Sequence, residues 1–223
     1  MTWALLAVNL AAYGWQLSAG ERSVLLGGAI PYELLTFQDL WPPALVPPPL
    51  TILTSMFLHG GLMHLGGNLL FLWIFGNNVE DALGRPRFLA FYLASGVAAA
   101  VAQTLATSVE AAGLTGADAT AVLSVPMVGA SGAIAGVLAA YLLLFPRARV
   151  QTLFVIVVLV RTVYLPAWLF IGAWFLFQVG AVVFGGMAGV AVFAHLGGFL
   201  AGLGVAMLSL IHISEPTRRT PIS

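Results

Sequence analysis

Six long, mainly apolar stretches limit this chain to a membrane-embedded fold. They cover residues 1–17, 62–76, 87–107, 131–145, 165–184 and 188–210. A helix that crosses the hydrocarbon core of a bilayer needs roughly 20 mainly apolar residues. Charged residues make up only 7% of the chain, against about a quarter in soluble domains, so a water-soluble fold would lack a polar surface. The sequence therefore predicts an all-α, polytopic membrane protein with six transmembrane helices.

The chain is expected to form one membrane domain over residues 1–207. Its first stretch resembles a signal peptide in length, but it has no basic n-region and no good cleavage site, so a retained helix is favoured. The first outer loop, at about residues 18–58, is long and holds Trp41-Pro42-Pro43 and Pro47-Pro48-Pro49 among apolar residues. This composition predicts a segment that rests in the outer interface. Residues 150–164 are apolar but include Arg161, which predicts an interfacial segment before the fifth span.

Residues 208–223 are expected to be a non-native tail. The run from Leu208 to Arg218 resembles a translated sequencing-library adapter, and the composition changes there from apolar to polar. His212 and the charged residues that follow it therefore receive no functional weight.

The distribution of arginine predicts the orientation. Arg85 and Arg87 lie in the loop between the second and third stretches, and Arg147 and Arg149 lie between the fourth and fifth. Arginine-rich short loops face the cytoplasm. The amino terminus is therefore expected in the cytoplasm, and the first and third loops outside.

Several classes of function are excluded by what the chain lacks. It has no cysteine and no lysine, and its net charge is zero, so no thiol chemistry and no basic surface for nucleic acid are expected. No Asp or Glu lies inside a span and no His-Glu-x-x-His motif occurs, which excludes an aspartyl intramembrane protease, a zinc protease and a Ser-His-Asp triad. No metal and no cofactor are expected.

The polar residues that do lie inside the spans point to one site. Ser131 begins the fourth stretch, His195 lies in the sixth, and His64 and Asn68 lie in the second. Ser131, His195 and His64, together with His59 at the entrance of the second stretch, are placed at one depth in the outer half of the bilayer. Polar groups inside a membrane are costly and usually functional. The pattern predicts a Ser-His dyad, with Ser131 as the nucleophile and His195 as the general base. His64 and Asn68 are four residues apart and share a helix face, so both are candidate donors to an oxyanion.

Close packing of two helices is needed to bring Ser131 to His195. The small-residue motif Gly132-x-x-x-Gly136 lies on the same stretch as Ser131, and Gly198-x-x-x-Gly202 on the same stretch as His195. Such motifs let helix backbones approach closely in membranes.

The sequence resembles the rhomboid family of intramembrane serine proteases. The resemblance covers about residues 50–207 and is carried by the segments 59–68 (HGGLMHLGGN), 129–132 (GASG) and 194–198 (AHLGG). It implies a six-helix, rhomboid-like fold of the bacterial type and an inner membrane as its location. It also implies an active site that opens to the outer side and cleaves transmembrane segments of other membrane proteins. By position, Ser131 matches the nucleophile, His195 the base, and His64 and Asn68 the oxyanion donors. His59 matches a histidine of structural rather than chemical importance.

Two departures from the family pattern bear on the site. Many rhomboids place an aromatic residue four positions after the serine, against the catalytic histidine, where this chain has Ala135. Many also carry Trp-Arg nine residues before the first histidine of the motif, where this chain reads Leu50-Thr51. What orients His195 is therefore left open by the sequence.

Two other functions remain as alternatives. A rhomboid-like protein that binds membrane clients without cutting them usually lacks the serine or the histidine, and this chain keeps both. A small transporter or metal channel could use His59, His64 and His195, but it would need further ligands or an acidic residue at the midplane. Taken singly, Ser131 has a rival interpretation as a helix-packing residue, and His64 and Asn68 as an interhelical hydrogen bond.

Overall fold

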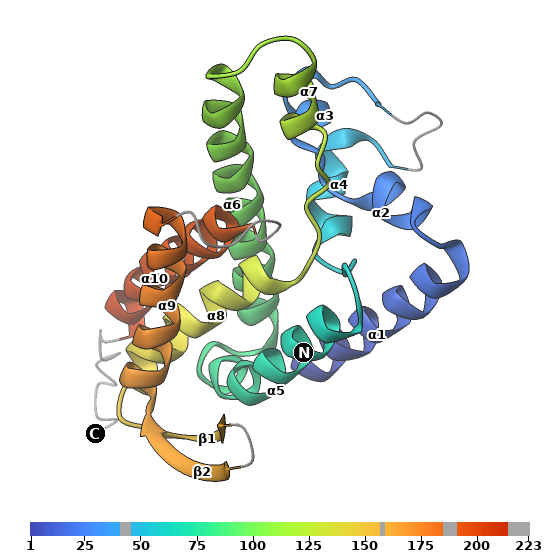
Figure 1. Ribbon diagram of the computed structural model, residues 1–223. Coiled ribbons are helices and arrows are strands. Elements are labelled where there is room, and N and C mark those ends of the chain that lie inside the picture. Colours follow the sequence, from blue (N-terminus) through green and yellow to red (C-terminus); the bar gives the residue numbers. More distant parts are fainter. Residues whose placement is uncertain (41–45, 157–158, 185–190, 214–223) are drawn as a thin grey trace, which may run out of the picture.

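The computed structural model describes residues 1–40, 46–156, 159–184 and 191–213. These residues form ten helices and one two-stranded sheet (Figure 1). The elements are α1 (Thr2–Ala19), α2 (Arg22–Gly27), α3 (Pro31–Thr36), α4 (Pro48–Ser55), α5 (Leu62–Leu83), α6 (Arg85–Ala112), α7 (Ala117–Leu123), α8 (Ser131–Leu144), β1 (Arg149–Ile156), β2 (Leu159–Pro166), α9 (Ala167–Phe184) and α10 (Val192–Ile213).

The six longest helices coincide with the six apolar stretches of the sequence. These helices are α1, α5, α6, α8, α9 and α10. Among the described residues, one helix, α6, is both long and apolar enough to cross a membrane by length and composition, while parts of α8, α9 and α10 form shorter apolar helices. The prediction of a mostly helical protein is confirmed, and the number of six membrane spans stays a prediction.

The hairpin of β1 and β2 corrects the expectation of an all-α fold. Arg149 pairs with Pro166 and Leu153 with Thr162 in an antiparallel register, and the hairpin hangs below α8 and α9 (Figure 1). This part of the sequence is dense in Val, Ile and Thr, which fit a pleated strand better than a helix. Of the segment expected at the interface, residues 150–156 and 159–164 lie in these two strands, and residues 157–158 lie outside the described part.

The first loop contains the short helices α2, α3 and α4. Proline at the first position starts both α3 and α4, as is common because the missing N–H would be unpaired there. Trp41-Pro42-Pro43, part of the predicted interfacial segment, lies outside the described residues. At the other end of the chain, α10 runs through the expected boundary at residue 207 to Ile213, and residues 214–223 lie outside the described part, so the non-native tail stays a prediction.

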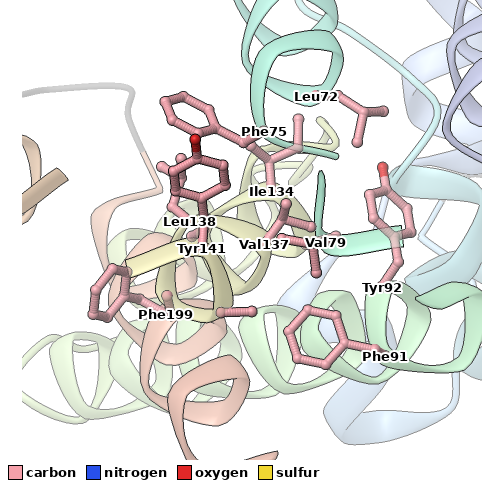
Figure 2. Close-up of a cluster of buried hydrophobic side chains, with 14 of the residues drawn as sticks. Leu72, Phe75, Val79, Phe91, Tyr92, Ile134, Val137, Leu138, Tyr141 and Phe199 are labelled. Atoms are coloured by element: carbon pink, nitrogen blue, oxygen red, sulfur yellow. The ribbon is translucent and has the colours of Figure 1, made fainter. Parts of the chain in front are cut away.

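Helix α8 is the central helix of the core. It contacts α5, α6, α9 and α10, and every residue from Gly132 to Tyr141 is buried. Figure 2 shows side chains of α8, among them Ile134 and Leu138, gathered with Phe75 of α5 and Phe199 of α10. A helix that is apolar on all faces belongs in the interior, which explains why α8, with no charged residue along its length, holds this position.

Glycine brings α8 and α10 into direct backbone contact. A β-carbon added at Gly198 would overlap the carbonyl oxygen of Gly132, and one added at Gly202 would overlap Cα of Gly136. The predicted packing of the two small-residue motifs is therefore confirmed. We call these four residues the glycine seam. Because Gly132 faces Gly198 while Gly136 faces Gly202, the two helices run in the same direction, and their amino-terminal ends lie together.

Substitution of one seam residue is expected to destabilise the protein. Gly202→Ala places a methyl group against the α8 backbone, and overpacking of this kind typically costs about 1–3 kcal/mol. Gly204→Ala on the same helix is the matched control, since nothing lies within 4 Å of a β-carbon there. We expect thermal unfolding in detergent to show a lower Tm for Gly202→Ala and an unchanged or slightly higher Tm for Gly204→Ala. Equal Tm values for the two variants would contradict the seam.

Candidate active site

Ser131 and His195 are joined by a hydrogen bond. Ser131 is the first residue of α8, and His195 lies in the first turn of α10. The distance from Oγ of Ser131 to Nε2 of His195 is 2.8 Å, which is ordinary for a hydroxyl bonded to an imidazole. The glycine seam aligns the starts of the two helices, so residues 64 positions apart in the chain meet at one point.

The second ring nitrogen of His195 has a partner that the sequence analysis did not identify. Oε1 of Gln178, on α9, lies 3.0 Å from Nδ1 of His195, and Gln178 is only 4% exposed. The ring of Trp174, one turn earlier on α9, lies 5.9 Å from the imidazole between centroids. Helix α9 therefore supplies the contacts to the His195 ring that the methyl side chain of Ala135 cannot make. A lone glutamine in an otherwise apolar stretch was the available signal.

His64 and Asn68 lie against the main chain that precedes Ser131. A β-carbon added at Gly129 would lie 2.7 Å from Nε2 of His64 and 3.7 Å from Nδ2 of Asn68. Gly129 has a φ of 125°, a conformation that residues with a β-carbon rarely adopt. The main-chain N–H of Gly129 also donates to the carbonyl of Ser55 at 2.9 Å. The structure thus brings both side chains of α5 beside the loop that leads into the serine.

Both side chains present unused donors at this loop. The Asn68 Nδ2 group is buried and makes no hydrogen bond within the described part of the protein. The main-chain N–H of Gly60 donates to Nδ1 of His64 at 3.3 Å, so the proton of a neutral imidazole lies on Nε2, the atom nearest Gly129. The first amides of α8 also lack partners inside the helix. These donors surround one small region next to Ser131.

A cavity opens at Ser131. Its lining combines loop and helix residues: Ser55, Met127, Gly129, Ser131, Ala191 and Ala194. Small residues of α6 and α10, among them Gly96 and Ala194, also line it. The cavity therefore borders the serine of the dyad.

His59 is placed as a structural residue. Its side chain is 2% exposed, and its ring meets that of His64 edge-on at 5.2 Å. Gln16 of α1 clamps its main chain, because the His59 N–H donates to Oε1 at 2.8 Å and Nε2 of Gln16 donates to the His59 carbonyl at 3.1 Å. This paired contact fixes the turn from which the main-chain N–H of Gly60 donates to Nδ1 of His64.

No group of three or more His, Asp or Glu side chains gathers as metal ligands would in the part of the chain that the structure describes. The four histidines of the sequence include His212 in the expected tail, and the other three do not converge with a carboxylate. The side chains at the site are suited to proton transfer and hydrogen bonding.

Comparison with known proteins identifies the family. A family model described as the Rhomboid domain matches residues 48–212. The chain belongs to the rhomboid family. Relatives include the mitochondrial Rhomboid protein 1 of Saccharomyces cerevisiae, 32% identical over 91% of this chain and 51% of its own length. Rhomboid protease AarA of Providencia stuartii is 33% identical over 63% of this chain and 49% of its own.

The relatives do not all carry the name of a protease. Presenilin-associated rhomboid-like protein of human mitochondria is 33% identical over 68% of this chain. This rhomboid spans about half the length, or less, of the curated relatives it matches. Some of them are named as proteases and others only as rhomboid proteins. Rhomboids are integral to membranes. Because mitochondrial proteins stand among the relatives, the comparisons do not support the expected bacterial inner membrane.

The burial of His59 predicts a pH-dependent stability of this rhomboid. Burial, with a further contribution from the charge of neighbouring His64, lowers the pKa of His59 from 6.5 to about 4. The unfolded chain therefore takes up this proton at a higher pH than the folded chain, and stability is lost as pH falls from about 6.5 towards 4. We expect the Tm of the wild type to fall more steeply over this range than that of His59→Phe. Both proteins keep His64 and His195, so parallel curves would rule out His59 as the cause.

Proposed function

We propose that this rhomboid is an intramembrane serine endopeptidase. The observation that carries the proposal is the 2.8 Å hydrogen bond from Ser131 to His195. Beside the preceding Gly129 lies the buried Nδ2 group of Asn68, which has no hydrogen-bond partner among the described residues. A serine hydroxyl becomes a useful nucleophile when an adjacent base accepts its proton. Fixed donors beside it are what the tetrahedral intermediate of acyl transfer requires.

In the proposed reaction, Oγ of Ser131 attacks the carbonyl carbon of a peptide bond. Nε2 of His195 takes the hydroxyl proton and then gives it to the leaving amine as the C–N bond breaks. An acyl-enzyme ester on Ser131 remains. Water, deprotonated by His195, attacks this ester, and the proton returns to Oγ as the carboxylic product leaves.

The oxyanion of the tetrahedral intermediate is proposed to accept from three donors. These are Nδ2 of Asn68, Nε2–H of His64 and the main-chain N–H of Ser131. The first is buried without a partner, and the Gly60 contact directs the proton of the second towards Gly129. The amino-terminal end of α8 adds the positive end of its dipole. An unpaired buried donor costs about 1–3 kcal/mol, and a role in the transition state accounts for keeping it.

The proposed substrates are transmembrane segments of other membrane proteins. The dyad lies at the start of helices that correspond to the fourth and sixth apolar stretches. The arginine pattern places these starts on the outer side and the amino terminus in the cytoplasm. The bilayer core holds no water, and the proposed route for water to Ser131 is the cavity that this residue lines.

Ser131→Ala is expected to abolish cleavage of a single-span model substrate in liposomes. The wild type should cleave it, and a chelator should have no effect, because no proposed step uses a metal. Cleavage is measured as product formation over time on gels. Equal cleavage by wild type and variant would overturn the nucleophile assignment. Binding of the substrate by both proteins without any cleavage would favour the client-binding alternative.

Asn68→Ala is expected to lower kcat by about 10²–10³-fold with little change in KM, because loss of an oxyanion donor acts only on the transition state. Asn77→Ala is the matched control, since Asn77 lies on the same helix and donates only to the carbonyl of Trp73. Single-turnover kinetics with the same substrate separate the two constants. A rise in KM at constant kcat would assign Asn68 to substrate binding instead.

A further inference from the structure

We infer that Gln178 is a positioning residue that fixes the tautomer of His195, in place of the carboxylate of a triad. The inference rests on the proposed function, since it concerns the base of the Ser-His dyad. Its evidence is the pair of contacts on the imidazole, from Ser131 on one side and Gln178 on the other. Nothing in the family match or in the names of the relatives assigns a role to this residue.

The geometry places the ring between two oxygen atoms. Nε2 of His195 lies 2.8 Å from Oγ of Ser131, and Nδ1 lies 3.0 Å from Oε1 of Gln178. Both distances are those of ordinary hydrogen bonds. Gln178 is 4% exposed, and leaving a buried amide oxygen without a partner is unfavourable. The contact with His195 is therefore favourable for both residues.

The chemistry of the two partners determines where the imidazole proton lies. A neutral imidazole carries one N–H, and an amide oxygen only accepts. The proton must then lie on Nδ1, where it is donated to Gln178. Nε2 is left with its lone pair facing the hydroxyl of Ser131, as a general base requires. With the proton on Nε2 instead, the ring would have no lone pair for the serine proton.

His64 shows the opposite arrangement, and this contrast supports the inference. Its Nδ1 accepts the N–H of Gly60, which leaves the proton on Nε2. The main chain thus fixes His64 with a donor at Nε2, and the amide of Gln178 fixes His195 with an acceptor at Nε2. Each tautomer fits the role proposed for its residue.

A neutral amide suits this position better than a carboxylate. Gln178 lies on α9, which has no charged residue along its length, and a carboxylate inside a span is costly. Among the described residues, the titratable group that acts on His195 is His64 of α5. The neighbouring residues of α6 and α8, Gln103 and Ser131, are neutral. The amide dipole can therefore orient the ring without adding a charge to the apolar surroundings.

Trp174 limits the other freedom of the ring. Residues 174 and 178 are four apart on α9 and lie on one helix face. The indole lies 5.9 Å from the imidazole, tilted by 45°. The tryptophan restricts rotation of the ring, and the glutamine selects which nitrogen holds the proton.

Three variants of the full-length protein in liposomes test the inference. Gln178→Met removes the acceptor at similar length, Gln178→Glu restores an acceptor and adds a charge, and Leu176→Met is the control on the exposed face of α9. We expect Gln178→Met to lower kcat by about 10- to 100-fold at nearly constant KM, which is a part of the roughly 10²–10⁴-fold that a general base contributes. We expect Gln178→Glu to recover activity with its acidic limb at higher pH, because a carboxylate favours the imidazolium. Leu176→Met should match the wild type.

A second measurement does not depend on activity. Side-chain ¹⁵N NMR of histidine-labelled protein reports which ring nitrogen carries the proton. We expect protonated Nδ1 and bare Nε2 for His195 in the wild type, and a shift towards the other tautomer in Gln178→Met. A wild type with protonated Nε2 would overturn the inference, even if Gln178→Met folds poorly.

The outcomes separate the inference from the proposed function. Wild-type kcat and pH profile in Gln178→Met, together with an inactive Ser131→Ala, would overturn the role of Gln178 and leave the protease standing. An inactive wild type would count against the protease, and the NMR tautomer would then decide the role of Gln178 alone.

Discussion

The contact between the backbones of α8 and α10 is the constraint from which the site follows. Lipid is as apolar as a leucine side chain, so helices in a membrane are held by close packing and by hydrogen bonds rather than by the hydrophobic effect. The glycine seam gives this packing its closest form, with main chain against main chain. Since the helices run in the same direction, their first turns lie together. Ser131 and His195 occupy those turns, and no loop has to place either of them.

Around this pair, two other helices complete the site with groups that the apolar interior would otherwise exclude. Helix α5 brings His64 and Asn68 to the loop before the serine, and α9 brings Gln178 to the far side of the imidazole. Each of these polar groups either has a partner that fixes its hydrogen atoms or is left with a donor unused. In water, the difference in free energy between a paired and an unpaired polar group is small, because solvent satisfies both. Inside a bilayer they are strong, since an unpaired group finds no replacement.

The sequence was informative where polar residues are rare. Ser131, His195, His64 and Asn68 stand out as polar residues in apolar stretches, so a candidate site made of these residues could be proposed without coordinates. The hairpin of residues 149–166 was not, because a run of apolar, β-branched residues looks the same in composition whether it forms a strand or part of a span. Gln178 was missed for another reason. It stands out as a lone glutamine in an apolar stretch, but its contact with His195 depends on the rotation of α9 relative to α10, which is set by packing.

The clamp between Gln16 and His59 bears on what counts as the minimal protein. The family match begins at residue 48, yet the side chain of Gln16 pairs with both main-chain groups of His59. A fragment cut to the matched boundaries would bury an N–H and a carbonyl with no partner, one residue before the amide that holds His64. The family match therefore begins later in the chain than the shortest segment in which the buried main-chain groups of His59 have partners. Helix α1 contains none of the proposed catalytic residues, yet it belongs to the smallest fragment that keeps His64 in its position.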